Sequence, residues 1–166
     1  MKHQGKTAAL CRAAMICALY VALTWVCGLL GLANMPVQLR LAEALCVLPF
    51  FMPEAIAGLT VGCLVANFLV GCIWQDILFG TLATLLGALG TYAMRHLRGK
   101  FRFLAVLPPI VANTVIVPFV LRYAYGIGDG WLVLAAGVGA GEIVSVGVLG
   151  IFLMLALEKQ PFWRKS

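Results

Sequence analysis

Apolar stretches of about twenty residues recur along this chain and restrict its fold more than any other feature. The sequence is 63% hydrophobic and only 11% charged, a composition that excludes a soluble globular domain. A helix needs about 20 residues to cross the hydrocarbon core, so the chain has room for about six crossings joined by short connections. The sequence therefore predicts an all-α polytopic membrane protein, with residues 1–166 forming a single integral membrane domain.

The apolar pattern places six spans along the chain. They are expected at Ala8–Leu32, Arg40–Met52, Glu54–Val70, Asp76–Arg95, Phe103–Tyr123 and Trp131–Leu157. The second is too short to cross a bilayer alone, so we expect it to be tilted or to form a broken element with the third. The N-terminal run continues for about twenty residues without a small-residue cleavage site, which favours a retained helix over a signal peptide.

Basic side chains gather at alternate ends of these spans. Three clusters hold them: Lys2, Lys6 and Arg12; Arg95, Arg98, Lys100 and Arg102; and Lys159, Arg164 and Lys165. The positive-inside rule then places both termini, and the connection between the fourth and fifth spans, on the cytoplasmic side of the cell membrane. The net charge of +6 follows from this topology and does not indicate nucleic-acid binding.

A balanced set of polar and aromatic residues is expected at the opposite end of the bundle. Its members are Arg40, Glu43, Trp74, Asp76, Arg122, Asp129 and Trp131. A solute arriving from outside would meet this end first.

Motifs for catalysis or metal binding are missing from the sequence. The six cysteines show no C-x-x-C pair and lie mostly inside expected helices, which favours packing as small apolar residues. No H-E-x-x-H, G-x-S-x-G or phosphate-loop pattern occurs. We therefore expect no metal, no cofactor and no enzymatic activity in this chain.

Small residues at four-residue spacing form stripes on three of the expected helices. The stripes are Ala14, Ala18 and Ala22; Gly58, Gly62 and Ala66; and Gly137, Gly141 and Ser145. Such stripes let helix backbones approach closely in lipid. We expect the second and third stripes to pack inside the bundle. The alanine stripe is equally suited to internal packing and to docking on another membrane subunit.

Two polar residues are expected near the middle of the membrane. Glu142 follows Trp131 by eleven positions, about 16 Å along a helix. A carboxylate at that depth needs a cation or several donors, either from neighbouring helices or from a ligand. Asn113 lies at a comparable depth, where its amide suits either recognition of a heterocycle edge or helix association.

Other polar residues are expected at the outer ends of the helices. Asn67 and Asp76 flank a short connection, and Asp76 is a candidate helix cap. Arg40 and Glu43 are three positions apart, which predicts an ion pair beneath a lid formed by the loop Asn34–Leu39.

Four aromatic residues have two possible uses at the same end: Trp74, Trp131, Tyr123 and Tyr125. They fit an interfacial aromatic belt, and one or two of them are alternatively placed to stack on a flat ligand.

Three sequence runs together resemble one family. LRLAEALCVLPFF is followed by VGCLVANFL and then by QDILFGTLATLLGAL, with the strongest part over Arg40–Leu89. This combination is similar to the QueT family, the substrate-binding S components of energy-coupling factor (ECF) transporters assigned to queuosine precursors. The resemblance extends over most of the chain.

The resemblance implies a six-helix S component that binds a deazaguanine, such as queuine or its aminomethyl precursor. It also implies docking onto a membrane coupling subunit joined to two cytoplasmic ATPases, through Ala14, Ala18 and Ala22. In such transporters the S component is thought to topple in the bilayer while carrying its ligand.

The chemistry of a deazaguanine suggests hypotheses for individual residues. Carboxylates accept hydrogen bonds from ring N–H groups, amides read carbonyl and amino groups, and aromatic rings stack on the ring. The candidate substrate-binding residues are Glu142, Asn113, Asn67, Glu43, Arg40, Asp76, Trp74 and Trp131.

Two alternative functions remain open. The same fold suits an S component for another small vitamin, such as thiamine or riboflavin. A structural or assembly membrane protein with no solute is the other alternative, and in it Glu142 is a helix-packing group.

Overall fold

The structure is a computed structural model and describes residues 2–31 and 40–160. Every regular element in these ranges is helical, as predicted for an all-α polytopic membrane protein. The elements are α1 (Lys2–Leu29), the 3-10 helix η2 (Leu41–Phe50), α2 (Glu54–Leu69), α3 (Trp74–Ala93), the 3-10 helices η3 (Met94–His96) and η4 (Gly99–Val106), α4 (Leu107–Tyr123), α5 (Trp131–Glu142), the π-helix η5 (Ile143–Gly150) and α6 (Ile151–Glu158). The expected lid Asn34–Leu39 lies outside the described residues.

Each of the six expected spans corresponds to helical structure. Among the described residues, four helical segments are long and apolar enough to cross a membrane: Gly5–Leu29, Trp74–His96, Gly99–Tyr123 and Trp131–Glu158. Leu41–Phe50 and Glu54–Leu69 are shorter apolar helices, and a turn at residues 51–53 joins them. The short second element is therefore a separate 3-10 helix that precedes α2.

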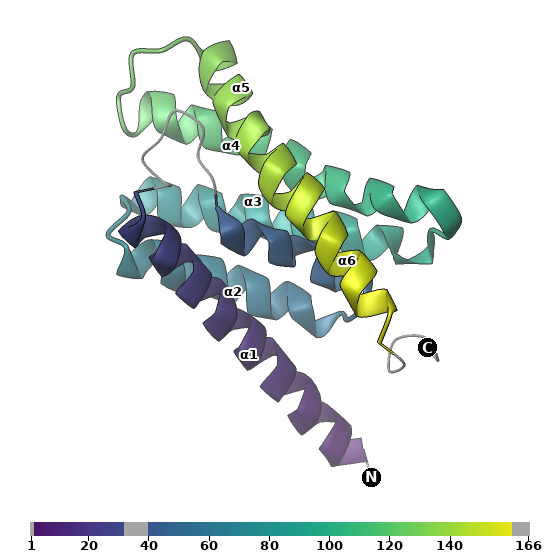
Figure 1. The fold of residues 1–166 in the computed structure, drawn as a ribbon. Helices are drawn as coiled ribbons and strands as arrows, with labels where there is room; N and C mark the ends of the chain where they lie inside the picture. Colours follow the sequence, from purple (N-terminus) through teal and green to yellow (C-terminus); the bar gives the residue numbers. More distant parts are fainter. Residues whose placement is uncertain (1, 32–39, 161–166) are drawn as a thin grey trace.

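The short helix η2 lies at the centre of the bundle. Helices α2, α3 and α4 run side by side, α1 lies obliquely along α2, and the continuous segment α5–η5–α6 crosses the other face (Figure 1). η2 packs against α1, α2, α3, η5 and α6, and seven of its ten residues are buried. The long helices therefore enclose η2, and a polar side chain on it lies in the protein interior.

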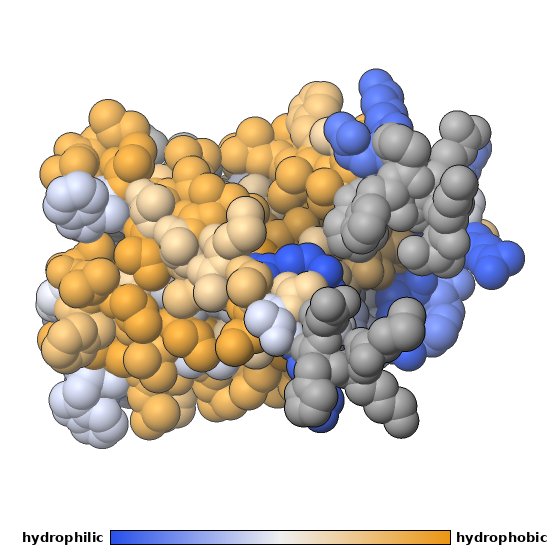
Figure 2. Space-filling view, turned by 90° about the horizontal axis from the view of Figure 1, so that it is seen from below, coloured by the Kyte–Doolittle hydropathy of each residue, from blue (hydrophilic) through white to orange (hydrophobic). Residues whose placement is uncertain are grey.

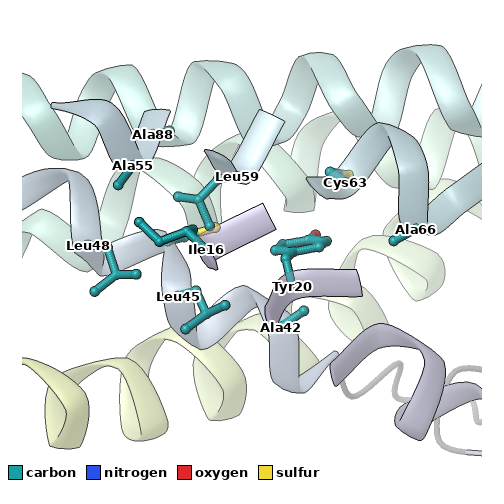
Figure 3. Close-up of a cluster of buried hydrophobic side chains, with 11 residues drawn as sticks. Ile16, Tyr20, Ala42, Leu45, Leu48, Ala55, Leu59, Cys63, Ala66 and Ala88 are labelled. Carbon is teal, nitrogen blue, oxygen red and sulfur yellow. The ribbon is translucent and has the colours of Figure 1, made fainter. Parts of the chain in front are cut away.

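The hydrophobic core between α1, η2 and α2 surrounds one tyrosine. Ile16 and Tyr20 of α1 meet Leu45 and Leu48 of η2 and Leu59 of α2 (Figure 3). The Tyr20 side chain is only 1% exposed in this cluster. This packing fixes α1 against η2 and places a hydroxyl group deep in the bundle.

Glycines let α1 and α2 approach closely. A Cβ atom built on Gly58 would lie 2.6 Å from the carbonyl oxygen of Ala13, and one on Gly62 would lie 2.9 Å from Cβ of Tyr20. Both distances are too short for any larger residue. This confirms that the stripe of Gly58, Gly62 and Ala66 packs inside the bundle.

A second close approach joins α3 to α4. A Cβ atom on Gly87 would lie 2.7 Å from Cα of Pro109, and one on Gly90 would lie 2.4 Å from Cβ of Pro108. The prolines occupy the first turn of α4, where their missing N–H groups cost no helical hydrogen bond. Both helices are therefore held together at the end where α4 begins.

The last span buries its small-residue stripe, as expected. Gly141 and Ser145 are buried and Gly137 is half-buried. The backbone keeps helical angles from Trp131 to Glu158 and widens to a π-helix immediately after Glu142. Such wide turns are rare and are found most often at functional sites.

Charged residues gather at one end of the molecule, here called the basic end. In the face drawn in Figure 2, hydrophobic residues cover most of the surface and hydrophilic residues lie toward one end. Two ion pairs lie at the basic end: Arg12 with Glu54, and Arg102 with Glu158 at 2.9 Å. The apolar surface between the two ends fits a membrane protein.

Replacement of Gly58 by alanine is expected to destabilise the bundle by about 1–3 kcal/mol, because the new methyl group overlaps the backbone of α1. The thermal unfolding midpoint of the detergent-purified protein measures this effect. Gly28→Ala is the matched control, since a Cβ atom there meets nothing within 4 Å. Equal midpoints for the two variants would show that α1 and α2 are not in close contact.

Candidate functional site

Several polar side chains are buried inside the described part of the bundle. They are Glu43, Asn67, Asp76, Thr84, Thr91, Asn113, Glu142 and Ser145. Thr84 and Thr91 donate to backbone carbonyls, at 3.1 Å and 2.9 Å, and need no further explanation. The others include five of the eight residues that the sequence predicted for substrate binding.

Glu43 is the centre of the first group of polar residues. Its side chain is 1% exposed and receives the Tyr20 hydroxyl at Oε1. Oε2 accepts the Cys46 thiol at 3.1 Å and, weakly, the Asn113 amide at 3.5 Å. Donors from α1, η2 and α4 thus converge on one carboxylate, which is the condition for burying it in an apolar bundle.

Glu142 belongs to the same group of residues. It is the last residue of α5 and is 5% exposed. It interacts with the Asn113 amide and electrostatically with Glu43. Its Oε2 atom has no hydrogen-bond partner, and neither has the hydroxyl of Ser145 one turn further on. We call Tyr20, Glu43, Asn113, Glu142 and Ser145 the Glu43 cluster; it holds hydrogen-bonding capacity that the described residues do not use.

The expected ion pair between Arg40 and Glu43 is wrong for the described residues. Arg40 precedes η2 with an extended backbone, φ −113° and ψ 95°, so the two residues are not three positions apart within one helix. Burial acts to lower the pKa of Arg40, but the nearby Asp76, followed by Tyr20 and Glu43, raises it overall. Arg40 therefore acts electrostatically on both buried groups, most strongly on Asp76.

Asp76 does not cap its helix, contrary to the sequence expectation. Ile73 occupies the cap position of α3 without a side-chain hydrogen bond, and Asp76 lies in the first helical turn. Its Oδ2 atom accepts the hydroxyl of Tyr125 at 3.0 Å. Burial and the charge of Asp76 both raise the pKa of Tyr125, so this hydroxyl remains a donor at neutral pH.

Asn67 lies beside Asp76 across a glycine. A Cβ atom on Gly80 would lie 3.1 Å from Nδ2 of Asn67 and 3.5 Å from Oδ1 of Asp76. Asn67 also donates to the sulfur of Cys63 at 3.5 Å. We call Arg40, Asn67, Asp76 and Tyr125 the Asp76 cluster. Arg40 links this cluster electrostatically to Glu43.

The two tryptophans lie apart from both clusters. Trp74 is 67% exposed and lines an apolar surface groove of about 330 Å³ with residues of α2 and α3. Trp131 packs against Phe119, with ring centroids 5.6 Å apart. These positions resemble those of an interfacial aromatic belt, and ligand stacking by either ring stays a prediction.

A second and larger groove, of about 480 Å³, lies between α3 and α4. Phe79, Phe119 and Tyr123 line it together with aliphatic residues, and Gln75 is its polar member. Neither Glu43 nor Glu142 lines either groove. We therefore assign the candidate site to the buried clusters, where the polar chemistry is, and regard the grooves as lipid-facing surface.

Comparison with known proteins identifies the family of this chain. The QueT transporter family model matches residues 10–159. This chain belongs to the QueT transporter family. The queuosine precursor transporter QueT of Lactococcus lactis subsp. cremoris (strain MG1363) is 38% identical over 82 residues, which are 49% of this chain. The match covers 48% of that relative, about half its length. No solved structure matches this chain.

Sequence reasoning missed the roles of four residues in the candidate site of this QueT family member: Tyr20, Cys46, Ser145 and Tyr125. Tyr20 lies in the middle of the first apolar span, far from the interfaces where tyrosine is expected, and that depth was a usable signal. Cys46 was interpreted as a packing residue, yet its thiol donates to Glu43. Tyr125 lies in the connection between α4 and α5, and only the fold brings it to Asp76.

Replacing Tyr20 by phenylalanine is expected to cost about 1–3 kcal/mol of stability, because it removes the hydroxyl that donates to Oε1 of the buried Glu43. Thermal unfolding in detergent measures the loss. Tyr123→Phe removes the same hydroxyl from an exposed ring and is the control. A Tyr20 variant as stable as this control would show that the hydroxyl does not support Glu43.

Proposed function

We propose that this chain is the substrate-binding S component of an ECF importer for a queuosine precursor. Membership of the QueT transporter family supports the transport role. The observation that carries the proposal is the Glu43 cluster, in which polar groups from α1, η2, α4 and α5 meet inside an otherwise apolar bundle. Intramembrane ionisable residues of this kind usually mark a substrate pathway.

The Glu43 cluster has the chemistry to bind the polar edge of a deazaguanine. The ring N–H and the exocyclic amino group are parallel donors, and the two oxygens of a carboxylate accept such a pair. Glu43 supplies the carboxylate, and the amide of Asn113 is placed to bind a ring carbonyl. In the Asp76 cluster, Asn67 and Arg40 offer further contacts nearer the end of the bundle. A ligand would then replace the weak 3.5 Å bond between Asn113 and Glu43.

The charge distribution supports one orientation in the membrane. Arg95, Arg98, Lys100 and Arg102 lie on or beside η3 and η4, at the same end as Arg12 of α1. With this basic end in the cytoplasm, both termini are cytoplasmic and both polar clusters lie toward the outside. The ligand would therefore enter from outside and await inward transfer.

The exposed face of α1 supports a docking role for its alanine stripe. Ala14, Ala18 and Ala22 are all exposed, while Ile16 and Tyr20 face the bundle. The glycine contacts with α2 use a different face of α1, so the alanines are free for another helix. Small residues allow close approach of a membrane coupling subunit, whose two ATPases would supply the energy.

Purified protein is expected to bind queuine or its aminomethyl precursor saturably and selectively over guanine, thiamine and riboflavin, as measured by quenching of tryptophan fluorescence. Glu43→Gln is expected to weaken binding about 10-fold or more, since it removes a charged acceptor. Glu158→Gln makes the same change in an ion pair at the basic end and is the control. Selective binding of a vitamin, or no binding by folded protein, would contradict the proposed ligand.

Ala18→Trp is expected to abolish uptake in cells and copurification with the coupling subunit, while leaving ligand binding to the isolated chain unchanged. The reason is that a bulky ring on the exposed stripe prevents close helix contact. Leu86→Trp is the matched control, because Leu86 is an exposed residue on α3. Normal uptake by the Ala18 variant would argue that the partner docks on another surface.

A further inference from the structure

Buried carboxylates outnumber cations around the two clusters. Glu43, Asp76 and Glu142 are each at most 5% exposed. No lysine or arginine whose side chain the structure describes is fully buried. Of these basic residues, only Arg40 lies beside the three carboxylates. The other half-buried arginines, Arg12 and Arg102, pair with glutamates at the basic end. One guanidinium thus faces three carboxylates.

The three carboxylates differ in how completely their charges are compensated. Glu43 has three donors, from a tyrosine, a thiol and an amide. Asp76 has the Tyr125 hydroxyl and the strongest electrostatic contact with Arg40. Glu142 has an interaction with Asn113 and an electrostatic contact with Arg40, and among the described residues no hydrogen-bond partner reaches its buried Oε2 atom. Of the three carboxylates, Glu142 is therefore the one whose negative charge is least compensated by neighbouring groups.

The surroundings of Glu142 suit a small cation with several hydrogen atoms to donate. The hydroxyl of Ser145, 1% exposed and also unpartnered, lies one turn beyond it on the same helix. Asn113 interacts with both Glu142 and Glu43, so one ligand in contact with this amide would reach both carboxylates. The π-helix that starts at Ile143 widens the backbone immediately beside this position.

We propose that Glu142 binds an alkylammonium group of the ligand while Glu43 binds the ring edge. This inference rests on the proposed function and makes it more specific: the preferred ligand is a deazaguanine with a protonated amine on its side arm. The ammonium group donates to Glu142 Oε2 and to the Ser145 hydroxyl, two groups for which the described part of the chain supplies no hydrogen-bond partner. Glu142 is then the residue that selects charged ligands over neutral ones.

The competing explanation is that Glu142 stays neutral and only packs between helices. Glutamine has the size of a glutamic acid side chain and carries no charge, so it mimics that neutral state. Glu142→Gln therefore separates the two explanations. Asp129→Asn removes a negative charge from the exposed α4–α5 connection and controls for the general field of the protein.

The test uses two ligands of nearly equal size, 7-aminomethyl-7-deazaguanine and the neutral 7-hydroxymethyl-7-deazaguanine. Wild-type protein is expected to bind the amine at least about 10-fold more tightly, and Glu142→Gln to lose most of that preference. Glu43→Gln is expected to weaken both ligands alike. Isothermal titration of the detergent-purified wild-type protein and the three variants measures the affinity of each for both ligands, with Asp129→Asn expected to behave as wild type.

The remaining outcomes overturn either the role of Glu142 or the proposed function, and the two cases can be told apart. Equal wild-type affinities for the two ligands would overturn the inference without any variant and leave the proposed function intact. An unchanged preference in Glu142→Gln, or an equal loss for both ligands, would likewise remove the role of Glu142 in charge selection. Failure of folded wild-type protein to bind either ligand would overturn the proposed function itself.

Discussion

Burial of the Glu43 carboxylate is the constraint on which the arrangement of this bundle depends. A carboxylate in an apolar interior is tolerated only when several donors surround it. Tyr20, Cys46 and Asn113 supply these donors from α1, η2 and α4. The oblique course of α1 and the central position of the short helix η2 bring the donors together (Figure 1). The same requirement that holds these helices in place builds the candidate ligand site.

Close helix packing gives α1 two faces with different tasks. Toward the bundle, α1 approaches Gly58 and Gly62 so closely that no side chain fits between the backbones. Tyr20 lies on this inner side and connects α1 to Glu43. On another side the alanine stripe is exposed and available to a partner helix. In the proposed transporter, one rigid helix thus joins the docking surface to the ligand site.

The individual polar residues of the site were largely predictable, whereas their partners were not. Glu142 and Asn113 stood out in the sequence because ionisable and amide groups are rare at mid-membrane depth. The Arg40–Glu43 pair was wrong because it rested on spacing along one helix, and the Asp76 cap was wrong because it rested on the residue type near a helix start. In the structure Glu43 and Asp76 bind Tyr20 and Tyr125, which are 23 and 49 positions away. Spacing rules describe neighbours within a helix and contain no information on such distant contacts.

The sequence by itself determined that this is a helical membrane protein, because long apolar runs leave the bilayer as the only suitable solvent and helices as the way to satisfy the backbone. It also determined where the spans lie and which family the chain belongs to. Only the tertiary structure decided which donors meet Glu43, which face of α1 is exposed and that Oε2 of Glu142 has no hydrogen-bond partner among the described residues. These features depend on the rotation and crossing of helices, which are set by side-chain packing between segments far apart in the chain.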